Sequence, residues 1–230
     1  MCYSFKTSIL SYMLGMISGI IAILTNQIVL GVLILTYSQM QLTEMLIWHG
    51  IDTNNENLNK FGTSYGKYLL ATHNIAIGLG ILLYVHFVKK QKLEIKDFIP
   101  LIVGILFFIF IFIIYYLPNN YEHLTYPLDK SCVDVDKCQN PNNRLKWPWP
   151  HDWYIYSYII SLILLFIYIR PLNSMIWLGA MFTITFIYML VFNKKVVGSL
   201  WCFSTAILAP ILVIVNYFLI KGENPQNILT

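Results

Sequence analysis

One acidic side chain, Glu44, lies inside a long apolar stretch, four residues before that stretch ends. It shares one helical face with Tyr37, Gln41 and Trp48, because spacings of three and four residues return to the same side of a helix. An ionisable group at membrane depth costs about 2.5–3.5 kcal/mol on insertion scales, so it faces a bundle interior and takes a partner. Such a carboxyl can relay protons, bind a cation or hold a metal-activated water.

Two other apolar stretches bring polar side chains toward the same end of the molecule. His73 and Asn74 lie early in the stretch 67–88, and Ser199 and Cys202 lie early in the stretch 196–220. Because a short loop makes consecutive helices neighbours, we expect His73 at the depth of Glu44 and a hydrogen bond between them. The predicted ligand-binding residues, covered by the Trp-rich segment 146–153, are Gln41, Glu44, Trp48, His73, Asn74, Ser199, Trp201 and Cys202.

This set of residues allows three kinds of function. The first is non-enzymatic binding or passage of a small molecule or ion, with Glu44 as the charged centre, and this is the function we expect. The second is a membrane-embedded metal hydrolase that acts on lipid, in which Glu44, His73 and Cys202 would hold zinc. The third is a structural or interaction protein whose polar residues only clasp helices, at about 0.6 kcal/mol per hydrogen bond. No cofactor is expected, and zinc enters only under the second alternative.

The composition identifies the solvent around these residues. Of 230 residues, 57% are hydrophobic and 11% are charged, and the mean hydropathy is +0.63. A soluble domain carries about 25% charged residues, so this chain cannot cover a water-facing surface. The composition excludes an ordinary soluble enzyme and a disordered regulator, and the net charge of +4 gives no reason to expect a nucleic-acid partner. The expected partner is the lipid bilayer, and the oligomeric state is left open.

The apolar stretches predict an all-α integral membrane protein with one transmembrane domain. A helix needs about 20 apolar residues to cross the hydrocarbon core. About seven stretches satisfy this requirement, at residues 8–24, 28–48, 67–88, 98–117, 152–169, 172–192 and 196–220. In the first stretch, Ser11, Gly15 and Gly19 form a stripe of small residues, which favours close helix packing.

Seven spans place the two termini at opposite ends of the bundle, which we name the A end (N-terminus) and the B end. The A end carries the predicted loop 49–66 and a long extramembrane loop, 118–151, whereas the basic cluster 89–92 lies at the B end. Basic residues favour the cytosolic side, so we predict that the N-terminus and the long loop are non-cytosolic. In that compartment Cys132 and Cys138 are candidates for a disulfide.

Three short motifs resemble a known group of proteins. The chain opens Met1-Cys-Tyr-Ser-Phe-Lys-Thr-Ser8, the second span contains Gln41-Leu-Thr-Glu-Met-Leu-Ile-Trp48, and the last span begins Gly198-Ser-Leu-Trp-Cys-Phe203. These motifs resemble a family of uncharacterised polytopic membrane proteins from bacteria and large DNA viruses. The resemblance covers about a tenth of the chain and implies no reaction. It implies that one set of residues serves the function together, namely Cys2, Ser4, Glu44, Trp48, Trp201 and Cys202.

Two better-known seven-span families fit the residues less well. Retinal proteins need a lysine inside the last span, but here Lys195 precedes that span and Lys221 follows it. Alkaline-ceramidase-like hydrolases hold zinc with a His-x-x-x-His pair in the last span, and this last span contains no histidine. Cys202 replaces one ligand at most, so a ceramidase-like hydrolase stays the alternative to small-molecule or ion binding.

Overall fold

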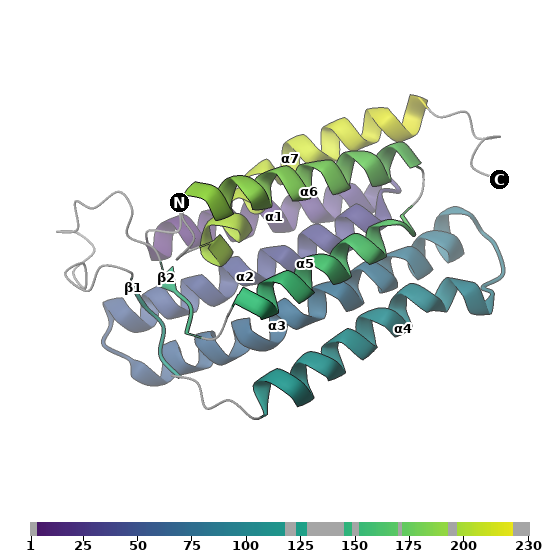
Figure 1. The fold of residues 1–230 in the computed structure, drawn as a ribbon. Helices are drawn as coiled ribbons and strands as arrows, with labels where there is room; N and C mark the ends of the chain where they lie inside the picture. Colours follow the sequence, from purple (N-terminus) through teal and green to yellow (C-terminus); the bar gives the residue numbers. More distant parts are fainter. Residues whose placement is uncertain are drawn as a thin grey trace.

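Long helices joined by short turns run back and forth between the two ends of the molecule (Figure 1). The computed structural model describes residues 4–117, 123–127, 145–148, 152–169, 172–192 and 197–222. In chain order, the elements are α1 (Phe5–Leu24), α2 (Ile28–Asp52), α3 (Glu56–Leu83) with the π-helical turn η1 (Tyr84–Val88), α4 (Ile95–Phe110) with the π-helical turn η2 (Ile111–Tyr116), β1 (Tyr126–Pro127), β2 (Leu145–Lys146), α5 (Asp152–Phe166), α6 (Leu172–Phe192) and α7 (Val197–Gly222).

The tight turns between the first helices follow from local chemistry. Asn26 and Asn54 have φ angles of 62° and 52°, a left-handed conformation that asparagine tolerates better than most residues. Asn55 then caps α3, because its side chain accepts a hydrogen bond from the backbone N–H of Leu58 at 3.1 Å. Two turns of three residues therefore make α1, α2 and α3 successive antiparallel neighbours.

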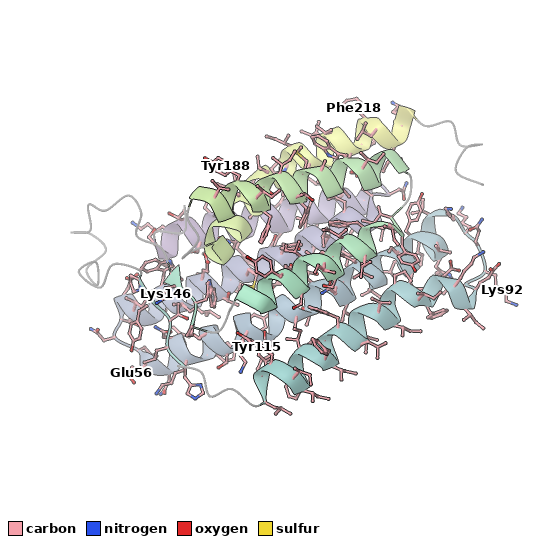
Figure 2. All side chains as sticks on the ribbon, in the orientation of Figure 1. Glu56, Lys92, Tyr115, Lys146, Tyr188 and Phe218 are labelled. Carbon is pink, nitrogen blue, oxygen red and sulfur yellow. The ribbon has the colours of Figure 1, made fainter. Side chains whose placement is uncertain are left out.

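The distribution of apolar side chains is that of a protein surrounded by hydrocarbon. Within the described residues, four helices are long and apolar enough to cross a membrane: Phe5–Leu24, Ile28–Asp52, Glu56–Val88 and Ile95–Tyr116. Large apolar side chains point outward along the flanks, as Phe218 does with 65% exposure, while Glu56 and Lys92 lie at opposite ends (Figure 2). An apolar exterior of this extent is consistent with an integral membrane protein.

The two central helices are α2 and α3. Within their most apolar windows, 67% and 61% of the residues are buried, against 33% for α1 and 22% for the fourth candidate span. Helix α2 packs against α1, α3 and α7, and α3 packs against α2, α4 and α5. The polar residues that the sequence places on α2 and α3 therefore lie in the middle of the bundle.

The helical fold is confirmed, but the predicted loop 49–66 is wrong. Helix α2 continues to Asp52 and α3 begins at Glu56, so only Thr53, Asn54 and Asn55 connect them. The first three turns of α3 are polar, and a search for apolar stretches does not detect them. The Asn55 cap and the packing of Gly62 against Ile47 make them helical. Because α3 begins earlier than predicted, every later residue of α3 lies farther from the A end than the sequence predicts.

Glycines fix the relative positions of α2 and α3. A Cβ on Gly66 would lie 3.4 Å from the hydroxyl oxygen of Thr43, and a Cβ on Gly80 would lie 3.0 Å from the Cα of Val29. These two contacts define an antiparallel register in which Thr36 lies opposite His73. The stripe of small residues predicted in α1 is confirmed as a packing face, because Ser11, Gly15 and Gly19 are buried.

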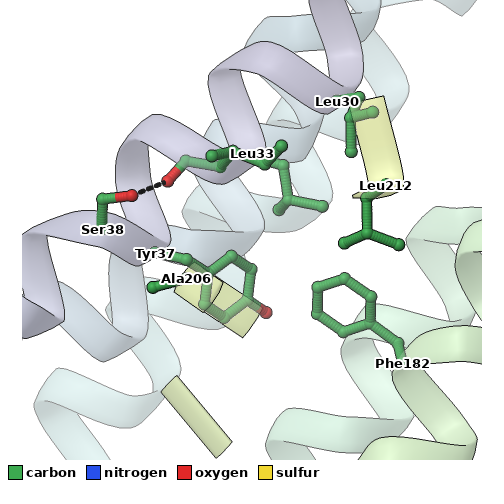
Figure 3. A pocket seen from close by; sticks show the side chains of 8 residues that line it. Leu30, Leu33, Tyr37, Ser38, Phe182, Ala206 and Leu212 are labelled. Atoms are coloured by element: carbon green, nitrogen blue, oxygen red, sulfur yellow. Dashed lines mark hydrogen bonds between the residues drawn. The ribbon is translucent and has the colours of Figure 1, made fainter. Parts of the chain in front are cut away.

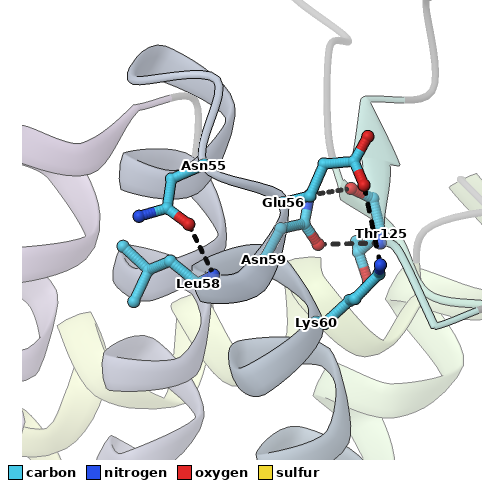
Figure 4. A network of polar contacts seen from close by, with 6 residues as sticks. All are labelled: Asn55, Glu56, Leu58, Asn59, Lys60 and Thr125. Carbon is cyan, nitrogen blue, oxygen red and sulfur yellow. Dashed lines mark hydrogen bonds and ion pairs between the residues drawn. The ribbon is translucent and has the colours of Figure 1, made fainter.

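A short β ribbon lies at the A end, where β1 and β2 pair antiparallel. Asn59 of α3 holds the residue before β1: its amide donates to the Thr125 carbonyl at 2.9 Å and accepts from the Thr125 N–H at 3.0 Å. The hydroxyls of Thr63 and Thr125 lie 2.8 Å apart beside this pair. Figure 4 shows Asn59 and Thr125 joined in this way, so the buried amide of Asn59 fixes the ribbon to α3.

Candidate functional site

Four predicted site residues lie in the interior of the bundle. Gln41 and Glu44 on α2 and His73 and Asn74 on α3 each have 0% of their surface exposed. They come from the two central helices, so they lie away from the apolar exterior. Polar side chains inside and apolar side chains outside are the arrangement expected of a functional membrane bundle.

The structure does not bring Glu44 and His73 together as expected. In the register set by the glycines, His73 lies opposite Thr36 of α2. Glu44 lies eight residues further along α2, toward the A end. Eight residues correspond to about 12 Å along a helix axis. The two side chains are described, and no hydrogen bond joins them. The predicted common depth is therefore wrong, because α3 begins before its apolar stretch.

His73 instead belongs to a hydrogen-bonded chain with two tyrosines. Its Nδ1 lies 2.7 Å from the hydroxyl oxygen of Tyr158 on α5, which in turn lies 2.7 Å from the hydroxyl oxygen of Tyr37 on α2. The rings of Tyr37 and His73 also stack at a tilt, with centroids 4.1 Å apart. This chain joins three helices deep in the bundle.

Polar atoms of two neighbouring residues have no partner among the described residues. They are Nε2 of His73 and both amide atoms of Asn74. Desolvating a polar group without a hydrogen bond costs about 1–3 kcal/mol in proteins, so native structures rarely keep such groups without a reason. These three atoms are therefore available to form hydrogen bonds in the interior of the bundle.

The described part of the predicted covering segment reaches the expected place. The ring of Trp147, which follows β2, packs against α3 where Gly66 has no side chain: a Cβ there would lie 2.7 Å from the ring. Gly66 lies beside Thr43, the neighbour of Glu44 in sequence. Trp147 is 6% exposed and Leu145 of β2 is fully buried. This part of the ribbon therefore covers the A end of the bundle at the level of Glu44.

Other predicted site residues have different positions. Trp48 is fully buried in an apolar cluster with Ile47, Leu69 and Tyr115, so it packs in the core. Ser199, Trp201 and Cys202 belong to the first turns of α7, and their side chains lie outside the described part of the structure. Cys2 and the disulfide candidates Cys132 and Cys138 also lie outside the described residues.

The proposed zinc ligands gain no support from the part of the chain that the structure describes. Within it, no three His, Cys, Asp or Glu side chains come close enough to hold a metal ion. Glu44 and His73 lie about two helical turns apart, and the third proposed ligand, Cys202, has no described side chain. A zinc site at Glu44, His73 and Cys202 therefore stays a prediction.

Toward the B end, an apolar layer separates this site from a second polar pair. A cavity of about 10 Å³ lies in that layer, with room for about one water molecule. It is lined by Leu30, Leu33, Ile34, Tyr37, Ser38, Phe182, Ala206 and Leu212, and the Ser38 hydroxyl donates to its own helix, at the Ile34 carbonyl (Figure 3). Beyond this layer, the amide of Asn216 donates to the side-chain oxygen of Gln27 at 2.8 Å.

No model of a protein family matches this chain, and neither does a curated protein or a solved structure. The resemblance to uncharacterised polytopic membrane proteins of bacteria and large DNA viruses therefore stays a prediction.

Tyr158 is not among the site residues predicted from the sequence. Tyr37 is predicted only to share a helical face with Glu44. The chain contains 16 tyrosines, and nothing in the sequence distinguishes these two. A usable signal existed for Asn216, because a single amide in an apolar span needs a partner. Gln27, in the connection between α1 and α2, is a candidate for that partner.

Proposed function

We propose that this chain is a multi-pass membrane protein of seven spans that binds a small molecule or ion inside the bundle, between the apolar layer and the A end. The site contains Asn74 and His73, with Gln41 and Glu44 toward the A end. The N-terminus and the loop 118–151 are proposed to lie on the non-cytosolic side. A ligand would enter from the A end, because an apolar layer closes the bundle toward the B end.

Asn74 carries this proposal. It is fully buried, and neither its amide oxygen nor its amide nitrogen has a partner among the described residues. An asparagine that only holds helices together would make the hydrogen bonds that stabilise the fold, as Asn216 does with Gln27. Asn74 instead costs stability, which is expected of residues retained for function.

The available atoms define the chemistry of the ligand. The Asn74 amide offers two donors and an acceptor, and Nε2 of His73 offers either a donor or an acceptor, depending on the tautomer. A suitable ligand is small and presents both hydrogen-bond donors and acceptors, or is a cation that takes oxygen ligands. A purely apolar molecule would leave these atoms unpaired, so the site selects against it.

The test is thermal unfolding of the purified protein in detergent micelles, with Na⁺, K⁺, Ca²⁺, ethanolamine, glycine and glycerol as probes. A probe at a hundredfold excess over its Kd stabilises the folded state by about 2.7 kcal/mol. We expect at least one probe to raise the Tm of the wild type, and Asn74→Leu to abolish that rise.

Asn216→Leu is the matched control, because Asn216 is the same residue type and is 2% exposed at the B end. It should retain the rise in Tm. A rise that survives in Asn74→Leu would place binding elsewhere. If no probe acts and Asn74→Leu lowers the Tm, Asn74 is structural and the proposal is wrong.

A helix clasp is the second candidate, and the Tyr37–Tyr158–His73 chain favours it. This chain joins α2, α5 and α3 by two hydrogen bonds of 2.7 Å. A clasp accounts for His73 Nδ1 and the two tyrosines. It does not account for Asn74 or for Nε2 of His73.

A further inference from the structure

The Tyr37–Tyr158–His73 chain has the geometry for moving a proton. Its two links are both 2.7 Å long, and its members are 3%, 2% and 0% exposed, in that order. Short hydrogen bonds in a low-dielectric interior polarise one another along a chain. Bulk water does not interrupt these links, because all three side chains are buried.

The central hydroxyl allows two arrangements of protons. Tyr158 has one O–H proton, which it gives either to Nδ1 of His73 or to the oxygen of Tyr37. In the first arrangement His73 carries its proton on Nε2, and Tyr37 donates to Tyr158. In the second, His73 carries its proton on Nδ1 and donates to Tyr158, which donates to Tyr37. The histidine tautomer and the direction of the chain therefore change together.

We propose that this chain is a proton-transfer path between Nε2 of His73 and a water molecule at the Tyr37 hydroxyl. A proton binds to the lone pair of Nε2, and the Nδ1 proton moves to the Tyr158 oxygen. The original proton of Tyr158 moves to the Tyr37 oxygen, and that of Tyr37 leaves to a water molecule, for which the cavity that Tyr37 lines has room. Each oxygen gains one proton and loses one, and the imidazole ends neutral with its proton on Nε2.

Glu44 is a buried carboxyl group on the same helix as Tyr37, about 10 Å away along the helix axis. It lies seven residues from Tyr37 on the same face of α2, with Gln41 between them. Among the described side chains of the elements packed around His73, the buried titratable groups are Tyr37 and Glu44 on α2, Tyr158 on α5 and, in the apolar cluster around Trp48, Tyr115 on η2. Residues 99–114 of α4 and η2 contain no titratable side chain.

The apolar layer determines where the path stops. Tyr37 lines the apolar cavity together with Leu33 and Phe182, and it lies ten positions after Gln27, with nine residues of α2 between them. Those ten positions span about 15 Å. The path therefore exchanges protons within the part of the bundle nearer the A end. This inference goes beyond ligand binding and holds whether or not a molecule binds at Asn74.

The test is nitrogen NMR of the full-length protein in detergent micelles, with isotope-labelled histidine. The chain has five histidines, and the signal lost in His73→Gln identifies His73. If protons move along the chain, the two ring nitrogens of His73 give averaged shifts, because both tautomers are populated. A fixed clasp gives two separate shifts, because one tautomer is held.

Tyr158→Phe removes the central hydroxyl and keeps the ring, so it should convert the averaged shifts into those of one tautomer. Tyr37→Phe cuts the far link and should have the same effect, which provides a second variant if the first does not fold. Tyr115→Phe, at a buried tyrosine outside the chain, should leave the averaged shifts unchanged. A single tautomer in the wild type, or averaged shifts that persist in Tyr158→Phe, would overturn the proposal.

Discussion

Two buried asparagines with similar exposure differ in their hydrogen bonds, although the side-chain oxygen of Asn216 also has no partner among the described residues. The amide of Asn216 donates to Gln27 at 2.8 Å, whereas both amide atoms of Asn74 are unpartnered among the described residues. A hydrogen bond between helices stabilises the bundle, and an unsatisfied amide destabilises it. Stability measurements can therefore separate a structural asparagine from a functional one without knowledge of the ligand.

We predict that leucine has opposite effects at these two positions. Asn74→Leu should raise the free energy of unfolding by about 1 kcal/mol, because it removes unsatisfied polar atoms. Asn216→Leu should lower it by about 1 kcal/mol, because the Gln27 side chain loses its partner. Denaturant unfolding of the two variants in the same detergent measures both changes. A loss of stability in Asn74→Leu would contradict the functional assignment.

At the scale of elements, glycines determine how closely the central helices approach. A Cβ on Gly104 of α4 would lie 2.6 Å from the backbone oxygen of Asn74, and one on Gly78 would meet the backbone of α4 at Leu101. Helices in a membrane lack a hydrophobic driving force toward each other, so they associate through such close packing. The contact at Gly104 also fixes the backbone of the candidate site.

We predict that alanine has opposite effects at two glycines. Gly104→Ala should destabilise the protein by about 1–3 kcal/mol, because a backbone atom cannot move away from the new methyl group as a flexible side chain can. Gly179→Ala on α6 should stabilise it by about 0.5–1 kcal/mol, since its Cβ meets only the Phe166 ring at 3.9 Å and alanine favours the helix. Thermal unfolding of both variants tests this pair.

At the scale of the molecule, the two ends differ in construction. The A end has the β ribbon fixed to Asn59, and the B end has the turn at Lys92 (Figure 2). Helix α3 separates the exposed Asn57 from the exposed Lys92. Opposite accessibility of these two positions would show that this helix crosses the membrane.

We predict that a membrane-impermeant thiol reagent, added outside intact cells, labels Asn57→Cys and does not label Lys92→Cys. The background for both variants replaces Cys2, Cys132, Cys138 and Cys202 with serine. The expectation follows from the basic cluster 89–92, which favours the cytosolic side. Labelling of Lys92→Cys alone would reverse the orientation, and labelling of both would contradict a crossing by α3.

The sequence by itself determined the environment of the chain and the approximate positions of its helices. Hydropathy is a sum over local residues, so the apolar stretches were visible without a fold. The burial of Gln41, Glu44, His73 and Asn74 was also predictable, because a polar side chain in an apolar span avoids lipid. The start of α3 was not predictable from hydropathy, because its first turns are polar and become helical through capping and packing.

Only the tertiary structure decided which polar groups meet. The glycine contacts between α2 and α3 place His73 opposite Thr36, about 12 Å from the level of Glu44. They also bring His73 to Tyr37, and the partner Tyr158 comes from a helix 85 residues away in sequence. Hydrogen-bond partners depend on register to within one helical turn, and contacts between distant residues set that register. Local sequence patterns carry no such information.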